Sequence, residues 1–155
     1  MKRFVAAFLA ILVVLEAPVW AGIGSKNTMY VGGTVTSIKE QTEGKSSASD
    51  EKVWVFQYKG GKLTVPYDRM NALEYGQRAG RRLGLAIAIS PLALFSKKRK
   101  HFLTINYLDE NDKQQAAVFE LGKDVIRTSL ATLEARSGRK IDYQDEEARK
   151  GGRGH

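Results

Sequence analysis

The feature that most constrains this chain is the segment from Gly76 to His101, GQRAGRRLGLAIAISPLALFSKKRKH. It begins with glycines and arginines, becomes apolar from Leu83 to Phe95, and then carries a run of lysine and arginine. A helix that spans a membrane needs about 20 apolar residues. The apolar run is shorter than that, and Ser90 and Pro91 interrupt it. The sequence therefore excludes a spanning helix here.

The first part of this segment carries small residues at a spacing of four, at Gly76, Gly80, Gly84 and Ala88. Residues four apart lie on one face of a helix. Such a face lets a second backbone approach closely, and it needs such a contact because each glycine costs a helix about 1 kcal/mol relative to alanine. We therefore expect an inserted, glycine-rich apolar helix that packs on the domain's own sheet or on a second copy of the chain.

Three interpretations of the apolar run stay open. It forms a helix or strand in the core, as runs of this length usually do, or it contacts a partner protein, or it lies at a membrane interface. In the interfacial case, Leu92, Leu94 and Phe95 make the apolar contacts while neighbouring cations bind lipid phosphates. The run of cations is also typical of a solvated turn that keeps an apolar segment soluble. The cations expected to bind anions or lipid are Arg78, Arg81, Arg82, Lys97, Lys98, Arg99 and Lys100.

The first residues of the chain have the three parts of a secretory signal peptide. Lys2 and Arg3 are followed by an apolar stretch over residues 4–15, and Val19-Trp20-Ala21 has the small-residue pattern of a cleavage site. Glu16 and Pro18 end the apolar stretch early, which disfavours an uncleaved anchor. We expect residues 1–21 to be removed near Ala21 and the protein to be exported to the periplasm or out of the cell.

Composition narrows the class of protein further. The chain has 155 residues, no cysteine and a formal net charge of +8. This length suits one domain, and the lack of cysteine rules out disulfides, zinc–thiolate sites and cysteine nucleophiles. A basic exported protein is expected to meet an anionic membrane surface or an envelope protein, and nucleic acid is a poorer candidate in that compartment.

The rest of the chain predicts a mainly β protein, of the α+β class, with a bent antiparallel sheet closed by a C-terminal amphipathic helix. The predicted strands cover residues 29–39, 52–58, 63–65, 102–108 and 115–121. Gly32-Gly33 indicates a bulge in the first strand, and residues 59–62 and 109–112 indicate turns. Residues 70–75 form a strand or lead into the insertion, with Met70, Ala72 and Tyr75 facing inward.

The closing helix is predicted over residues 123–137. Val125, Ile126, Leu130 and Leu133 give it an apolar stripe, and Gly138 follows as a C-terminal cap. We expect the polar residues 40–50 to form a loop. The domain division is a signal peptide (1–21), one β-rich domain (22–143) with an insertion (76–100), and a charged flexible tail (144–155). Ile141 and Tyr143 are expected to pack against the domain.

No residue pattern identifies catalytic chemistry, a cofactor or a metal site. The two histidines are His101 and His155, and neither belongs to a recognisable Ser–His–carboxylate set. The glycine-rich stretch lacks the Lys-Ser/Thr of a phosphate-binding loop. The acidic turn at 109–112 is a poor calcium loop, because Gln114 stands where an EF-hand needs glycine. We expect a protein that is not an enzyme.

One local motif suggests a fold family. Residues 63–75 contain Pro66-Tyr67-Asp68-Arg69-Met70, which resembles the Pro-Tyr-x-x-Ile/Met turn between two strands of bacterial PH-like (pleckstrin-homology-like) domains. That resemblance implies a bent antiparallel barrel plugged at one end by the closing helix. The insertion is longer and more apolar than a loop of that family, and no ligand residue is transferred from it. The chain as a whole also resembles small exported bacterial proteins of unassigned function.

These observations predict an exported, non-catalytic binding or scaffold module at the cell envelope. Its expected mode of action is peripheral membrane association through the apolar and basic segment 83–100. One alternative is a self-associating structural protein, a homo-oligomer that packs through the stripe of small residues. A further alternative is an enzyme whose site the sequence does not reveal.

Overall fold

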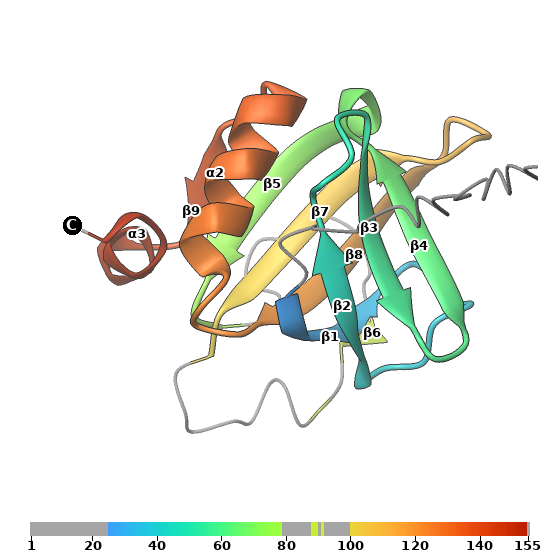
Figure 1. Cartoon of the computed structure of the whole chain (residues 1–155), viewed down its shortest axis with the longest axis horizontal. Helices are drawn as coiled ribbons and strands as arrows, with labels where there is room; N and C mark the ends of the chain where they lie inside the picture. The colour runs from blue at the N-terminus through green and yellow to red at the C-terminus, as the bar shows by residue number, and fades with distance from the viewer. Residues whose placement is uncertain (1–24, 79–87, 90, 92–99, 155) are drawn as a thin grey trace, which may run out of the picture.

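The computed structural model describes residues 25–78, 88–89, 91 and 100–154, so the predicted signal peptide lies outside the described residues. The described part is mainly β and carries two α-helices (Figure 1). Its elements are β1 (Ser25–Gly33), β2 (Thr42–Ser47), β3 (Val53–Tyr58), β4 (Gly61–Pro66), the 3-10 turn η1 (Tyr67–Arg69), β5 (Met70–Gly76), β6 (Ala88–Ile89), β7 (Phe102–Leu108), β8 (Gln114–Leu121), α2 (Ile126–Ser137), β9 (Ile141–Tyr143) and α3 (Glu146–Arg153).

The strands form one open, mixed sheet. Their order is β4-β3-β2-β1-β8-β7-β5-β9, and β6 pairs with the end of β1. Neighbours are antiparallel except for β9, which runs parallel to β5. Strand β1 joins two halves that are each nearly sequential in the chain, because it pairs with β2 on one side and with β8 on the other. The expected α+β class is confirmed.

Most strands with strong apolar or aromatic signals are where the sequence predicts them. The pairing of β1 with β8 shifts register between Tyr30 and Gly32, which confirms the bulge. Strand β1 begins earlier than predicted and ends at Gly33, so the predicted strand is wrong for residues 34–39, which form turns. Strand β4 pairs with β3 through a tight turn and forms one edge of the sheet, where Pro66 costs no hydrogen bond.

The predicted loop at residues 40–50 is wrong for Thr42–Ser47, which forms strand β2 between β1 and β3. Its inward positions carry small residues, and the register sets Gly44 beside the aromatic side chains of β3. A Cβ at Gly44 would lie 2.7 Å from the Phe56 ring. The hydroxyls of Thr28 and Ser46 bond to each other at 2.8 Å across the β1–β2 pair. Pairing on both sides and fit to large neighbours therefore override a polar composition.

The core is an aromatic cluster centred on Phe119 of β8. The ring of Phe119 lies 4.8 Å from that of Trp54, 5.1 Å from that of Phe56 and 5.7 Å from that of Tyr30, measured between centroids. Such tilted and edge-on pairs add to the free energy gained by burying the rings. Because these rings come from β1, β3 and β8, they hold the two halves of the sheet together.

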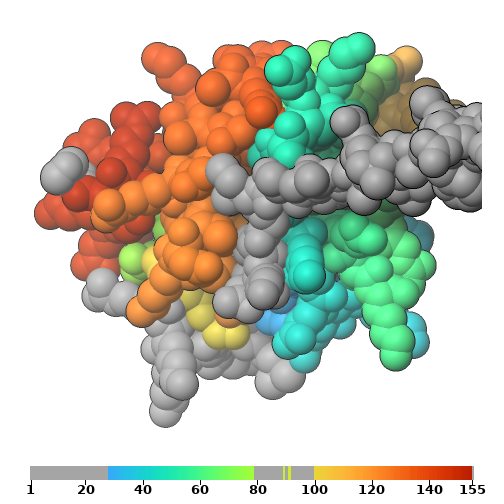
Figure 2. All heavy atoms as spheres, in the orientation of Figure 1, coloured from blue at the N-terminus to red at the C-terminus, as the bar shows by residue number. Residues whose placement is uncertain are grey.

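Helix α2 covers this core with the predicted stripe. The side chains that confirm the stripe by their burial are Val125, Ile126, Leu130 and Leu133. Gly138 adopts φ +67° and donates its N–H to Glu134, so the predicted cap is also confirmed. At the same end, Arg136 donates to the carbonyls of Ala48 and Asp50 in the β2–β3 turn. Figure 2 shows α2 (orange) beside the strands β2 to β4 (cyan to green) on this face of the molecule.

Strand β5 corrects one predicted core position. Met70, Leu73 and Tyr75 are buried, whereas Ala72 is exposed. The pairing of β5 with β7 shifts register between Met70 and Ala72. A one-residue irregularity reverses the face on which every later side chain lies. The prediction for Ala72 is wrong for that reason.

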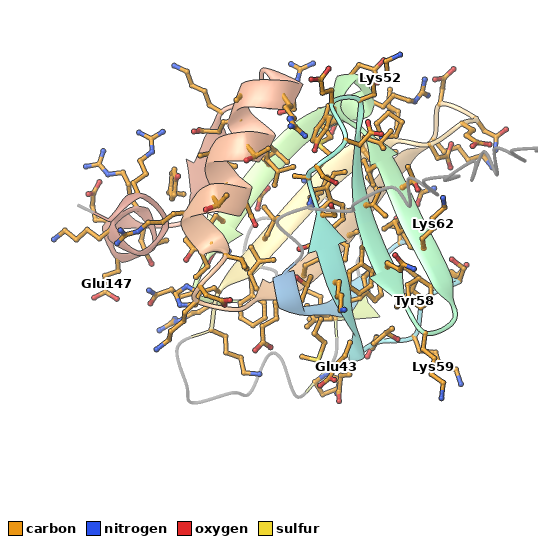
Figure 3. All side chains as sticks on the ribbon, viewed as in Figure 1. Glu43, Lys52, Tyr58, Lys59, Lys62 and Glu147 are labelled. Atoms are coloured by element: carbon orange, nitrogen blue, oxygen red, sulfur yellow. The ribbon has the colours of Figure 1, made fainter. Side chains whose placement is uncertain are left out.

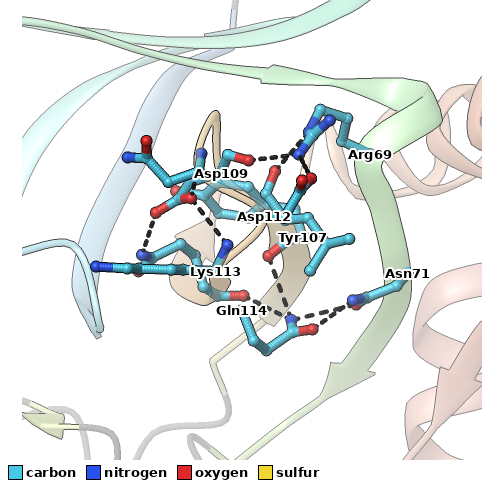
Figure 4. Close-up of polar contacts among 10 residues, drawn as sticks. Arg69, Asn71, Tyr107, Asp109, Asp112, Lys113 and Gln114 are labelled. Carbon is cyan, nitrogen blue, oxygen red and sulfur yellow. Dashed lines mark hydrogen bonds and ion pairs between the residues drawn. The ribbon is translucent and has the colours of Figure 1, made fainter.

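The acidic β7–β8 turn is tied to η1 and β5 by hydrogen bonds (Figure 4). Arg69 donates from Nε to the Leu108 carbonyl at 3.0 Å, and its NH2 group lies 2.5 Å from both the Asp109 carbonyl and the Asp112 carboxylate. Asn71 of β5 and Gln114 of β8 pair through their side-chain amides at 2.5 and 3.3 Å. Arg69 and Asp112 thus have structural partners.

The Asp109 carboxylate closes the same turn. It accepts from the Gln115 side chain at 2.7 Å and from the backbone N–H groups of Asn111 and Lys113 at 2.8 and 3.0 Å. These hydrogen bonds, with the one from Gln115 strongest, lower the pKa of Asp109 below its usual value. Asp109 and Asp112, which make the turn at 109–112 acidic, therefore stabilise that turn.

The expected flexible tail is wrong for Glu146–Arg153, which forms helix α3. The Asp145 side chain caps this helix by accepting from the Ala148 N–H at 2.7 Å. Ala148 and Gly152 are buried against the domain. The sequence does not predict this helix packing, because the segment is mostly charged and only two small residues are buried. Ile141 and Tyr143 pack against the core as expected, within β9.

Candidate functional site

The insertion leaves and rejoins the sheet at one end of the β5–β7 pair. Gly76, the last residue of β5, stands directly opposite Phe102, the first residue of β7. Helix α2 also begins on this side of the domain, because β8 ends beside the start of β7, where Leu121 donates its N–H to the His101 carbonyl at 2.7 Å. We call this region, formed by residues 76–78, 100–102 and 121–127, the insertion end; it lies at the lower left of the domain in Figure 1.

The predicted helix with a stripe of small residues is wrong at both of its described ends. Gly76 ends strand β5 and Ala88 begins strand β6, so neither of these two residues lies in a helix. Gly80 and Gly84 lie outside the described residues. Close approach does occur at Gly76, where the Gln144 side chain occupies the space of a Cβ. The contact belongs to the domain itself.

One described piece of the apolar run is part of the domain. Ala88 and Ile89 pair with Gly33 and Gly32 of β1. Ile89 packs against a small second core, separate from the main aromatic one, made of Val31, Phe102 and Val118. At Ile89, the one residue of the run whose side chain is described with its neighbours, the packing agrees with the interpretation of the run as interior. Leu92, Leu94 and Phe95, the predicted interfacial residues, lie outside the described residues.

Two of the predicted anion-binding cations are described, and both are at the insertion end. Arg78 is exposed, and its carbonyl accepts from the Gln144 side chain at 3.0 Å. Lys100 is half-buried and its Nζ lies 2.8 Å from the Glu120 carboxylate, so an ion pair occupies its charge. The predicted cations outside the described residues are Arg81, Arg82, Lys97, Lys98 and Arg99.

The structure adds two cations that the sequence analysis does not single out. Lys123 and Arg127, both exposed, line a solvent-open pocket of about 360 Å³ together with His101. Asp124, Ile126 and Gly151 complete its lining. Neither Lys123 nor Arg127 has an ion-pair partner among the described residues. His101 and Lys123 are far apart in sequence and meet only because β7 pairs with β8.

A buried tyrosine fixes the state of His101. The Tyr75 hydroxyl lies 2.5 Å from His101 Nδ1, and the two rings are stacked with centroids 6.1 Å apart. Burial raises the pKa of Tyr75 to about 12, so the hydroxyl keeps its proton at neutral pH. Nδ1 is the acceptor that the described residues provide for this proton. In the tautomer in which the Tyr75 hydroxyl donates to Nδ1, the neutral imidazole carries its own proton on Nε2, as a hydrogen-bond donor.

Burial and charge both favour the neutral form of His101. Burial lowers the pKa of its imidazole, the nearby Lys123 charge lowers it further, and Glu120 opposes them. At neutral pH the pocket is therefore lined by a neutral imidazole and two exposed cations. Helix α2 begins here without a side-chain cap, which adds weak positive potential at its first turn.

Helix α3 packs against the aromatic groups beneath the pocket. A Cβ at Gly152 would lie 2.7 Å from the Tyr143 ring and 2.9 Å from Leu130. The Arg153 guanidinium lies 5.3 Å from the centre of the Tyr143 ring and 3.4 Å from the Glu134 carboxylate. The helix is therefore held by close approach of its glycine and by contacts at its exposed end.

Gly152→Ala is expected to detach α3, because the added methyl group would overlap with Tyr143 and Leu130. Overpacking of this kind costs about 1–3 kcal/mol. Amide hydrogen exchange within 146–153 should become fast while exchange in β7 and β8 stays slow. Gly151→Ala is the matched control, because its Cβ would have only ordinary contacts, at 3.4 Å and beyond. Equal protection of α3 in both variants would contradict this account.

A second hollow, of about 200 Å³, lies between α2 and the ends of β2 and β3. Its lining is Trp54, Ala48 and five hydroxyl side chains, and its one charged residue is Arg136. That guanidinium already donates to two carbonyls of the β2–β3 turn. The insertion end, where Lys123 and Arg127 are exposed and unpaired within the described structure, is therefore the better candidate for binding a partner.

Searches find no protein-family model that matches this chain and no curated protein with significant sequence similarity. Within the residues that the structure describes, no helix is long and apolar enough to cross a membrane. The same part of the chain has no group of three or more metal-ligating side chains.

Proposed function

We propose that this protein is an exported, non-catalytic module that binds an anionic surface of the cell envelope through its insertion end. The observation that supports this best is the position of Lys123 and Arg127. Both are exposed and line a pocket with His101. His101 directly follows Lys100 in the chain, where the cation-rich insertion rejoins the sheet. Cations from distant parts of the sequence thus add to one surface, and each is worth about 1 kcal/mol near an anionic membrane.

The proposed apolar contribution comes from Leu92, Leu94 and Phe95, next to the cations at 97–99. Apolar side chains beside lysines and arginines are typical of segments that lie in a membrane interface. Ile89 packs within the domain, so it is not part of the proposed membrane contact. Export after removal of residues 1–21 would bring the protein to such a surface.

We also propose a PH-like architecture for the domain. Four sequential strands, β1 to β4, are joined through β1–β8 to a second group, β8-β7-β5. Helix α2 then follows and packs across the core, with Arg136 bonded to the β2–β3 turn. This order supports the resemblance at Pro66–Met70. The additional strand β9 and helix α3 at the β5 edge are features of this chain.

Vesicle co-sedimentation of residues 22–155 tests the proposed function. Binding is expected for vesicles that contain phosphatidylglycerol and not for vesicles of phosphatidylcholine alone. Lys123→Glu/Arg127→Glu, and separately Lys97→Glu/Lys98→Glu, should each weaken binding at least tenfold, by about 1 kcal/mol for each charge removed. Lys100 is kept, because it pairs with Glu120 in the folded domain.

The control is Lys59→Glu/Lys62→Glu. These two lysines project from the β3–β4 hairpin, at the side of the domain opposite α3 (Figure 3). All three double variants lower the net charge equally, so a difference between them reports position. If all three bind as the unmodified protein does, or all three lose binding alike, the insertion end is not the binding surface. Self-association through Gly76, Gly80, Gly84 and Ala88 is not carried further, because Gly76 and Ala88 lie in strands.

A further inference from the structure

We infer that the pocket lined by His101, Lys123 and Arg127 binds a phosphomonoester group. The inference deepens the proposed function and rests on it, since it names the chemical group that the insertion end recognises. The group could belong to a lipid headgroup or to a small soluble phosphate, and both present the same three terminal oxygens.

The first argument is the convergence of donors from separate segments. His101 immediately precedes β7, Lys123 lies between β8 and α2, and Arg127 is in the first turn of α2. A tetrahedral phosphate has three terminal oxygens and can accept from donors in three directions, whereas a carboxylate has two in one plane. Arginine and lysine are both common phosphate ligands. A pocket of about 360 Å³ leaves room for the group and part of the molecule that carries it.

The second argument is the charge balance around the pocket. Lys123 and Arg127 contribute two positive charges and Asp124 contributes one negative charge. Just beyond, Lys100 and Glu120 neutralise each other in an ion pair. The described groups therefore leave a net positive charge at the pocket with His101 neutral. A bound dianion would favour a further positive charge in the pocket, and protonation of the His101 imidazole would provide it.

The Tyr75 hydroxyl orients the His101 ring through its 2.5 Å contact with Nδ1. When this hydroxyl donates to Nδ1, the imidazole keeps an Nε2 proton for a ligand. Tyr75 is fully buried and is itself packed edge-on against Tyr143, so this arrangement is held rigidly. Gly151 lines the pocket without a side chain, and a Cβ added there would lie 4.0 Å from the His101 ring. A histidine that only packed at the edge of a strand would need no such support.

The chain provides its own reporter and control, because His101 and His155 are its only histidines. We would record the pKa of both imidazoles by NMR in residues 22–155, with and without glycerol 3-phosphate at constant ionic strength. A bound dianion favours the protonated imidazole, so the pKa of His101 should rise by about half a unit or more. The charged or titratable groups that face it are Tyr75, Lys123, Asp124, Arg127 and Glu120, and His155 should not respond.

The variants assign the effect to the pocket. Lys123→Gln/Arg127→Gln should abolish the rise in the His101 pKa and lower the affinity for glycerol 3-phosphate at least tenfold. Lys59→Gln/Lys62→Gln, which removes the same charge from the distant hairpin, should leave both unchanged. Both variants alter exposed side chains, so they are expected to fold, and unchanged amide spectra of β7 and β8 would verify it.

The outcomes distinguish a lipid headgroup from a soluble phosphate, and they separate this inference from the proposed function. A rise with glycerol 3-phosphate and with phosphatidic acid vesicles supports a lipid headgroup, while a rise with the soluble compound alone supports a soluble ligand. An equal rise with acetate or chloride would overturn recognition of phosphate. If no rise occurs while charge-dependent vesicle binding persists, this inference fails and the proposed function stands. If the rise occurs without vesicle binding, the pocket stands and the membrane function fails.

Discussion

Replacing Phe119 by alanine should lower the free energy of unfolding by about 3–5 kcal/mol. Phe119 is fully buried, and three aromatic rings pack around it. Strand β8 is fixed on both sides by β1 and β7, so the surrounding structure cannot close a cavity left there. The variant would lose both the free energy of burying the ring and its contacts with Tyr30, Trp54 and Phe56.

Urea denaturation followed by tryptophan fluorescence measures this effect directly. The Trp54 ring lies 4.8 Å from that of Phe119, and Trp54 is the only tryptophan in residues 22–155. Phe119→Leu is the control, because it keeps most of the volume and should cost about 1–1.5 kcal/mol. If the two variants were equally stable, the aromatic cluster would not be the centre of the core.

Gly44→Ala should destabilise the domain by about 2–3 kcal/mol, as overpacking in a rigid site does. Glycine in a strand is normally less favourable than alanine by about 0.5–1 kcal/mol, so sequence reasoning alone expects the opposite sign. The structure reverses the expectation, because a Cβ at Gly44 would lie 2.4 Å from the Gln57 carbonyl oxygen and 2.7 Å from the Phe56 ring. The carbonyl belongs to the backbone of β3 and cannot move aside.

The same urea titration measures this change. Gly60→Ala is the control, because Gly60 is exposed in the β3–β4 turn and its nearest neighbour is the flexible Tyr58 side chain at 3.1 Å. That variant should stay within about 0.5 kcal/mol of the unmodified protein. A gain in stability from Gly44→Ala would show that residues 42–47 do not pack against β3 as β2.

The sequence predicts elements whose own residues carry the signal. Strands β3 and β7 are rich in aromatic and β-branched residues, and α2 has an apolar stripe and a glycine cap. Strand β2 and helix α3 escape prediction because they are polar. Each is held by a small residue, Gly44 or Gly152, against a large neighbour, and such a fit is visible only after the chain has folded.

The small-residue stripe illustrates an ambiguity of period. Residues four apart share a face in a helix and also in a strand, where every second residue does. Gly76 and Ala88 lie in two different strands, at the end of β5 and the start of β6, so the helical interpretation of the spacing fails for them. A spacing of four therefore does not distinguish a helix from a strand by itself. The residues between these positions must also follow the period of 3.6 or the period of 2.

Two of the cations that the sequence singles out, Arg78 and Lys100, lie at the insertion end, and an ion pair already occupies Lys100. Their role as anion ligands stays a prediction. The pocket itself could not be predicted, since His101, Lys123 and Arg127 are brought together by pairing of β7 with β8 and by the start of α2. Each of these residues alone has an ordinary sequence context.

The pairing of β1 with β8 also determines when the domain can fold. Thr28 stands opposite Leu121, so a contact at the centre of the sheet joins two distant parts of the polypeptide. During synthesis, β1 emerges early, but it can pair with β8 along its second edge only after β8 has been made. Folding of such a nonlocal topology is slow and is completed only after nearly the whole chain is free. The nascent chain is therefore expected to stay unfolded until late, and the strands that emerge first expose unpaired edges of the kind that aggregate.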